Sequence, residues 1–179
     1  RVHIVYGLSK DWGMSGFRIG TLFTHNKRLL TAMDQVGYYQ SVSQHTQHIM
    51  TKLFQDTAWI EYYIEENQTR LYDTYRTLKE EALDPIGVPI VVPAQGSHFA
   101  WADFSSFLEP TSSSSEKELW LELFTETKVL FTTGESCFGD KPGMFRIVYP
   151  WPEGGKKAMK ELGKRLIKWK LSRDGGGKK

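Results

Sequence analysis

The chain has 179 residues, and its 40% hydrophobic and 13% aromatic content is enough to build a hydrophobic core. The formal net charge of +2 is too small to indicate a nucleic acid partner, and no apolar run approaches the roughly 20 residues that cross a bilayer. The single cysteine, Cys137, excludes an internal disulfide, and the first residues lack the features of a signal peptide. We therefore expect a cytoplasmic protein without a membrane partner.

The first part of the sequence alternates short strands with a glycine-rich loop. Apolar residues over Val2–Tyr6 predict a buried strand that ends at Gly7, and a second strand is expected at about 17–23. Asn26 is a suitable N-cap for the helix that follows, and another helix is expected at about 41–55. Since a domain rarely begins on a buried strand, we expect the chain to belong to a larger fold.

A long helix is predicted next. Apolar residues recur at intervals of three, four and seven from Ile60 to Leu78, which predicts a helix over about 57–82. The Asp84-Pro85-Ile86-Gly87 segment then ends it. The expected organisation is one partial domain at 1–56, a connecting helix at 57–83 and a compact α+β domain at 84–179.

Within 84–179, short strands alternate with two helices. Ser115 and Glu118 are spaced as a capping box at the start of one helix, and the last helix is expected from about Glu153 to Leu171. The strands are expected at 88–92, 97–104, 129–131 and 144–149. The whole chain is therefore of the α/β class.

The residues best suited to chemistry lie in the Gly7–Gly20 segment. Lys10 follows a predicted strand on a loop, Ser9 precedes it, and Arg18 comes eight residues later among glycines. A lysine amine becomes nucleophilic when it is fixed and partly desolvated, and a guanidinium can hold a phosphate through paired hydrogen bonds. A lone lysine is usually a solvated loop residue, but this combination favours a functional one.

The Gly7–Gly20 segment resembles the Schiff-base signature of class I and II aminotransferases, Ser-x-Ser-Lys followed by Gly-x-Arg-x-Gly. The first twenty residues of the chain, Arg1–Gly20, are most similar to 1-aminocyclopropane-1-carboxylate (ACC) synthases and their relatives. The resemblance implies that Lys10 carries pyridoxal 5'-phosphate as a Schiff base, while Ser9 and Arg18 contact its phosphate. Gly7 stands where the family has a serine, so one phosphate contact would be missing.

A second match lies at Pro142–Tyr149, which resembles the Pro-Gly-x-Phe-Arg strand of the same family. In the family this arginine binds the α-carboxylate of the amino-acid substrate, which implies that role for Arg146. An arginine on a strand presents paired donors to a carboxylate, although a lone arginine is more often a surface ion-pair residue.

The resemblance implies the carboxy-terminal part of a fold-type I enzyme: the end of the large mixed-sheet domain, a long connecting helix and a small α+β domain. The implied activity is transamination or an ACC synthase-like elimination, with a homodimer as the full-length parent. The other half of the family fold, with the aspartate that pairs with the cofactor's pyridine nitrogen, is absent from this chain. The alternative is a non-catalytic relative that serves as a dimerisation or interaction module.

Other polar residues favour structural roles. His45 and His48 are spaced for a metal, but no third ligand is evident, and we expect no metal site. The last helix carries many lysines beside an apolar stripe, a pattern that also occurs in membrane- and nucleic-acid-binding helices. A solvated outer face on a packed helix is the favoured interpretation.

Overall fold

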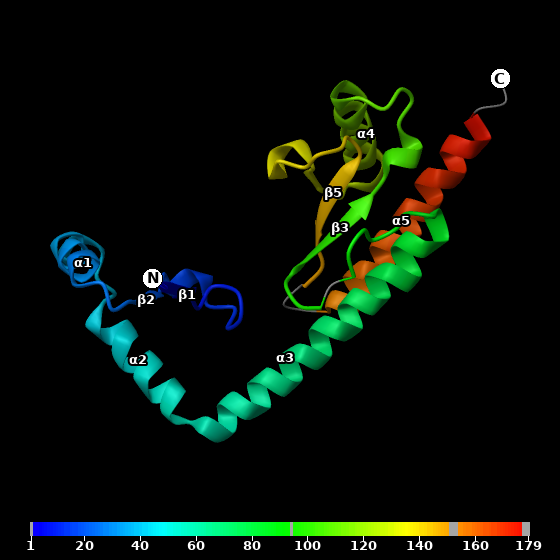
Figure 1. Cartoon of the computed structure of the whole chain (residues 1–179). Coiled ribbons are helices and arrows are strands. Elements are labelled where there is room, and N and C mark those ends of the chain that lie inside the picture. The colour runs from blue at the N-terminus through cyan, green and yellow to red at the C-terminus, as the bar shows by residue number, and fades with distance from the viewer. Residues whose placement is uncertain (1, 94, 151–153, 177–179) are drawn as a thin grey trace. The chain divides into compact units, whose positions relative to one another are not determined.

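The computed structural model describes residues 2–93, 95–150 and 154–176 (Figure 1). Close contacts divide the chain into two compact units, residues 1–65 (unit 1) and residues 66–179 (unit 2). The division falls inside the long helix α3, Thr57–Thr77. The two units are described separately below.

Unit 1 begins with an antiparallel hairpin of β1 (Ile4–Gly7) and β2 (Gly20–Phe23). Helices α1 (Lys27–Gln40) and α2 (Gln44–Gln55) follow, as the sequence predicts. The predicted N-cap is confirmed, because the Asn26 side chain accepts hydrogen bonds from the backbone N–H groups of Arg28 and Leu29. Ser43 caps α2 in the same way by accepting from the N–H of Thr46.

Unit 1 buries few of its apolar side chains. Among its described hydrophobic residues, only Leu8 and Met50 are buried, whereas Val5 is 80% exposed and Tyr39 85% exposed. The expectation of a buried first strand is therefore wrong for this chain, since all of β1 is exposed. The strand has the apolar composition of a buried strand, but the described residues supply no layer that covers it.

Unit 2 begins within α3, and the helix changes geometry at Leu78. After α3, the chain forms a π-helix, η2 (Leu78–Leu83), and then a short 3-10 turn, η3 (Asp84–Ile86), that contains Pro85. Gly87 closes this turn with φ 76°, in the left-handed region that glycine adopts without strain. The predicted helix and its end are thus confirmed.

The sheet of unit 2 has three antiparallel strands in the order β3-β5-β4. Its strands are β3 (Phe99–Asp103), β4 (Thr132–Thr133) and β5 (Met144–Val148). The strand expected at 88–92 is reduced to an isolated bridge between Ile90 and Ala102, and the strand expected at 129–131 begins only at Thr132. Local β propensity identifies extended segments, but the pairing partner decides which residues form a ladder.

The helices of unit 2 are α4 (Ser113–Thr127) and α5 (Gly155–Gly176). The capping box predicted at Ser115 and Glu118 is wrong, because the N-cap is Ser112, whose hydroxyl accepts from the N–H of Ser115. Four consecutive serines can each cap a helix, so the sequence alone does not select the register. The predicted start of the last helix, Glu153, lies outside the described residues.

The buried core cluster lies entirely between Leu78 and Trp169, within unit 2. Phe145 and Ile147 of β5 enter it from one face of the sheet, together with Ala100 and Ala102 of β3. Helix α5 packs along η2 (Figure 1), and it approaches most closely at Gly163. A Cβ added to Gly163 would overlap the backbone carbonyl of Glu81 and lie 3.1 Å from the Cα of Ala82.

This close approach predicts that Gly163→Ala destabilises unit 2. The added methyl group meets backbone rather than a flexible side chain, so α5 must move, and we expect a loss of about 2 kcal/mol in the free energy of unfolding. Gly175→Ala is the matched control, because it lies in the same helix with nothing within 4 Å of the added Cβ. Equal denaturation midpoints for the two variants would contradict the prediction.

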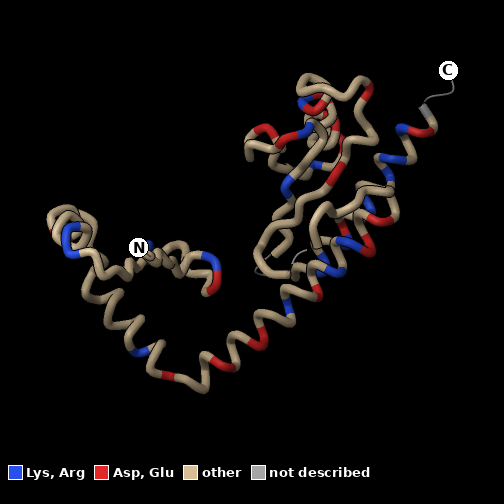
Figure 2. The backbone as a smooth tube through the Cα atoms, in the orientation of Figure 1, with Lys and Arg blue, Asp and Glu red and all other residues tan. Residues whose placement is uncertain are grey.

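The lysines and arginines of α5 are largely neutralised within unit 2. Lys156 pairs with Asp73, Lys160 pairs with Glu81, and Arg173 pairs with Glu122. Figure 2 shows basic and acidic residues interspersed along α3 and α5. The charges of α5 therefore mainly join helices to one another, in agreement with the packed, solvated helix favoured from the sequence.

Candidate active site

Lys10 lies in the loop that joins β1 to β2. The strand register pairs Gly7 with Gly20, and the N–H of Leu8 donates to the carbonyl of Ile19 at 3.2 Å, which extends the ladder by one pair. Ser9 and Arg18 follow this last hydrogen-bonded pair on either side, so both lie at the base of the loop that contains Lys10.

Arg18 occupies an unusual backbone position at the end of a 3-10 turn, η1 (Ser15–Phe17). Its φ is 54°, in the left-handed region, and one guanidinium nitrogen donates to the carbonyl of Ser15 at 3.0 Å. The side chain is exposed. An exposed guanidinium fixed at one end of a loop is suited to hold a dianion.

Lys10 is exposed, and its backbone is held by the turn that follows it. The N–H of Gly13 donates to the carbonyl of Lys10 at 3.1 Å, and the N–H of Met14 donates to the carbonyl of Leu8 at 3.2 Å. Gly13 adopts φ 63°, which this tight turn requires and which glycine tolerates best. The loop is thus ordered by its own backbone.

Arg146 lies at the centre of the sheet in unit 2. On β5 it pairs with Trp101 of β3 on one side and with Thr132 of β4 on the other. Because neighbours on a strand alternate faces, Arg146 lies on the face opposite the core residues Phe145 and Ile147. On this face, the half-buried guanidinium lies over the ring of Phe99.

The contacts of Arg146 leave part of the guanidinium unsatisfied. Its central carbon lies 4.8 Å from the centroid of the Phe99 ring, and Nη2 donates to the hydroxyl of Thr132 at a long 3.4 Å. Nε is buried and has no hydrogen-bond partner among the described residues. An unsatisfied buried donor costs about 1–3 kcal/mol, and these contacts leave this cost at Nε uncompensated.

A buried carboxylate supports the segment that leads into β5. Glu116 is only 2% exposed and accepts from the N–H of Gly143 at 2.6 Å and from the N–H of Glu135 at 3.3 Å. Gly143 has φ 90°, and a Cβ there would lie 2.7 Å from the Cα of Ser105. Packing therefore requires a glycine at position 143, directly before the arginine strand.

The far end of the arginine strand is also anchored. Tyr149 donates its hydroxyl hydrogen to the carbonyl of Ser97 at 2.6 Å, and Ser97 adopts φ 81°. Burial, and then the nearby Tyr75, raise the pKa of Tyr149 above 10.0. The phenol therefore remains a donor at neutral pH and holds the chain that enters β3 and positions Phe99.

The predicted site residues fall into two groups. Ser9, Lys10 and Arg18 share one loop of unit 1, and Arg146 lies on the sheet of unit 2. The sequence did not indicate Phe99, Thr132 or Glu116 as neighbours of the arginine strand. Alternation in the 97–104 segment could have placed Phe99 and Trp101 on one face, but their pairing with β5 requires the register.

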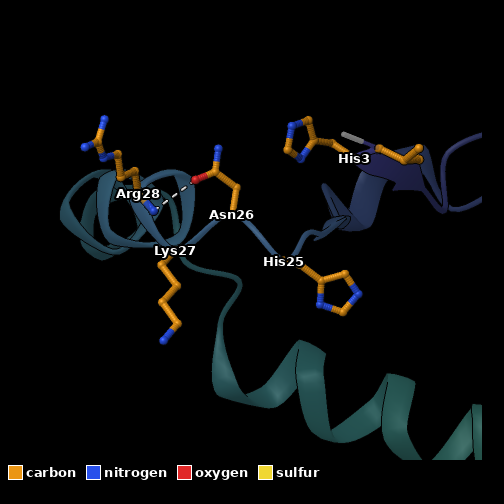
Figure 3. Close-up of a pocket in the computed structure, with 6 residues that line it drawn as sticks. His3, His25, Asn26, Lys27 and Arg28 are labelled. Atoms are coloured by element: carbon orange, nitrogen blue, oxygen red, sulfur yellow. Dashed lines mark hydrogen bonds between the residues drawn. The ribbon is translucent and has the colours of Figure 1, made fainter.

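Another hollow in unit 1 is less suited to chemistry. A hollow of about 840 Å³ lies between the start of the chain and α1, but it contains none of the predicted site residues (Figure 3). Its lining residues are Val2, His3, His25, Asn26, Lys27 and Arg28. Asn26 already caps α1, and His3 is hydrogen-bonded to Thr24.

Two features are absent from the described ranges of the chain. These ranges contain no group of three or more histidine, cysteine, aspartate or glutamate side chains that could hold a metal ion. None of their helices combines the length and the apolar character that a bilayer crossing requires.

Comparison with known protein families identifies the family of this chain. The family model described as aminotransferase class I and II matches residues 1–166. The chain belongs to this family. ACC synthase 6 of Oryza sativa subsp. japonica is 38% identical over 149 residues, which cover 83% of the chain. The mouse protein named "probable inactive ACC synthase-like protein 2" is 36% identical over 148 residues.

Solved structures agree with this family fold. An aromatic aminotransferase from Pyrococcus horikoshii OT3 superimposes with a TM-score of 0.79 at 19% identity, over 96% of this chain and 43% of that one. A PLP-bound putative aminotransferase from Clostridium difficile 630 gives a TM-score of 0.69 at 15% identity. The present chain spans only 27% of the length of the rice protein and 25% of the length of the mouse protein. Its α/β architecture is thus that of the carboxy-terminal part of a fold-type I enzyme.

Proposed function

We propose that the whole protein containing this chain is a pyridoxal 5'-phosphate-dependent enzyme that acts on α-amino acids through Lys10. The observation that carries the proposal is the ordered hairpin loop that contains Ser9, Lys10 and Arg18. The family supports a cofactor of this kind, and two of the similar solved structures are described as PLP-bound.

The residues present fit such a cofactor. A primary amine suits an aldehyde, and a hydroxyl and a guanidinium suit a phosphate. All three residues lie on one loop that its own backbone hydrogen bonds order. When bound, the cofactor supplies an electron sink for negative charge at the substrate Cα.

Each residue then has a defined task. Lys10 would hold the cofactor through Nζ and, as a free amine, would move the proton at the substrate Cα. Ser9 and Arg18 hold the phosphate. Arg146 binds the substrate carboxylate through its guanidinium, whose Nε has no hydrogen-bond partner among the described residues.

The proposed reaction is transamination or an ACC synthase-like elimination, because both begin with removal of the same proton. The proposed setting is a cytoplasmic homodimer. A second candidate is a non-catalytic relative that serves as a dimerisation or interaction module. Two observations favour it: Gly7 lacks the family hydroxyl, and the matched mouse and human relatives are both named "probable inactive".

The deciding experiment is reductive trapping in the whole protein. After incubation with pyridoxal phosphate, borohydride reduction should fix a pyridoxyl group on one peptide, with the added mass on Lys10. Abolition of the visible cofactor band by the same treatment would agree with this assignment. A protein that carries no label after saturation with cofactor belongs to the non-catalytic class.

The phosphate contacts give a further prediction. Arg18→Ala should weaken cofactor binding by about 2 kcal/mol, because a charge-assisted contact is lost. Gly7→Ser should strengthen binding by about 1 kcal/mol, since only the carbonyl of Ile19, at 3.8 Å, lies near the added Cβ. Equilibrium titration with cofactor measures both changes.

Arg28→Ala is the control for charge alone, because Arg28 is an exposed arginine of the same unit that lies outside the loop. Its affinity for the cofactor should equal that of the unmodified protein. If Arg18→Ala and Arg28→Ala bind equally well, the phosphate does not bind at Arg18.

A further inference from the structure

The segment immediately after Lys10 carries an aromatic side chain, Trp12, that packs into a cluster in unit 1. The Trp12 ring stacks on Tyr63 with centroids 5.2 Å apart and an interplanar angle of 14°, and it meets Phe54 edge-on at 4.9 Å. Trp59 stacks on Tyr63 at 5.1 Å and lies 6.3 Å from Trp12. Such geometries are favourable for aromatic pairs.

The cluster joins the loop to two helices. Phe54 belongs to α2, whereas Trp59 and Tyr63 belong to the first turns of α3. All four rings are half-buried, in a unit that otherwise leaves most of its large apolar side chains exposed. We refer to Trp12, Phe54, Trp59 and Tyr63 as the aromatic cluster.

Hydrogen bonds to Asp11 also hold the segment that follows Lys10. The Tyr6 hydroxyl donates to Asp11 Oδ2 at 2.8 Å and accepts from Trp12 Nε1 at 3.1 Å. The Tyr63 hydroxyl donates to the backbone carbonyl of Asp11 at 3.2 Å. Tyr63 therefore holds both residues that follow Lys10, one by its ring and the other by its hydroxyl.

Both phenols keep their protons at neutral pH. Burial, followed by the hydrogen bond to Asp11, raises the pKa of Tyr6 above 10.0, and burial and the charge of Asp11 raise the pKa of Tyr63. A raised tyrosine pKa means that the protonated, donating form is favoured in the folded state. These contacts are therefore present below pH 10 and are lost as the pH rises through the raised values.

We propose that Trp12 and Tyr63 are positioning residues that fix the backbone of Lys10 and so present its amine to the cofactor. This inference rests on the proposed function. Lys10 is bounded by the β1 ladder before it and by the aromatic cluster two residues after it, so its backbone is restrained on both sides. A displacement of reacting groups by about 1 Å can slow a reaction on the order of 100-fold, so this restraint affects chemistry as well as stability.

The test uses three variants in the whole protein. Trp12→Phe keeps a ring but loses the N–H donor, Trp12→Ala removes the ring, and Tyr63→Phe keeps the stack but loses the hydroxyl. Tyr62→Ala is the matched control, because Tyr62 is the adjacent tyrosine of the same helix and is 63% exposed. Each protein is examined by amide hydrogen exchange and by the rate at which added pyridoxal phosphate becomes attached to Lys10.

The exchange experiment needs no cofactor. The N–H of Gly13, which donates to the carbonyl of Lys10, should exchange about tenfold faster in Trp12→Ala and Tyr63→Phe than in the unmodified protein. Attachment should be at least about tenfold slower in Trp12→Ala and largely restored in Trp12→Phe. Tyr62→Ala should match the unmodified protein in both measurements.

The outcomes separate the two proposals. Unchanged exchange at Gly13 in both Trp12→Ala and Tyr63→Phe overturns the inference. Faster exchange with an unchanged attachment rate also overturns it, because the cluster would then stabilise the loop without positioning the amine. If the unmodified protein attaches no cofactor, the proposed function fails, while exchange at Gly13 still decides whether the cluster holds Lys10.

Discussion

Lys10→Ala should abolish covalent cofactor attachment in the whole protein while leaving the fold intact. The amine is the only proposed attachment point, and its loss also removes the proposed general base, a group that contributes on the order of 10²–10⁴ in rate. Because Lys10 is exposed, the free energy of unfolding should change by less than about 0.5 kcal/mol. Borohydride trapping, turnover and a denaturation curve measure the three effects.

Lys10→Arg is the informative companion, because it keeps a positive charge but cannot form the covalent link. It should bind cofactor non-covalently through Ser9 and Arg18 and should be as inactive as Lys10→Ala. Turnover of either variant at the rate of the unmodified protein would exclude Lys10 as the catalytic residue.

Arg146→Ala should raise the KM for the amino acid, because the carboxylate loses a charged partner. It should lower kcat/KM roughly 100-fold, which corresponds to a loss of about 3 kcal/mol in transition-state stabilisation. Stability should change little, because Arg146 makes one long hydrogen bond and its buried Nε has no partner among the described residues. Removal of an unsatisfied donor offsets the lost contact with Phe99. Arg146→Lys should restore only part of the affinity, since an ammonium cannot form paired bonds to one carboxylate.

Arg165→Ala provides the structural comparison in the same unit. Arg165 donates to the backbone carbonyl of Thr127 and pairs with Glu161, so its loss should lower the melting temperature and leave KM unchanged. Substrate titration and thermal melts on both alanine variants and on the unmodified protein separate the two roles. A destabilised Arg146→Ala with a normal KM would assign Arg146 to the sheet instead of the substrate.

The sequence predicted elements well where the signal is local. Asn26 is followed directly by a helix, and the observed cap is the predicted one. At residues 112–115 four serines compete, and the structure selects Ser112, three residues before the expected position. A local pattern thus predicts that a helix begins, whereas tertiary packing decides which of several equivalent residues begins it.

The site shows the same limit at longer range. Lys10, Ser9 and Arg18 are close in sequence, so their spacing alone indicated a shared loop. The contacts of Arg146 come from Phe99, 47 residues earlier, and from Thr132, and they depend on strand register that no local pattern encodes. The sequence does not distinguish Trp12 from other loop tryptophans, because its contacts with Phe54 and Tyr63 depend on where α2 and α3 pack.

The uneven distribution of buried side chains has a consequence for how variants of this chain are judged. Because the core cluster lies in unit 2, the heat absorbed on melting the isolated chain should come mainly from that unit, where most apolar surface is hydrated on unfolding. The calorimetric melting transition would then change little when a substitution disrupts the structure around Lys10. A normal transition is therefore weak proof that a substitution in unit 1 is harmless, and intactness there has to be established one amide at a time.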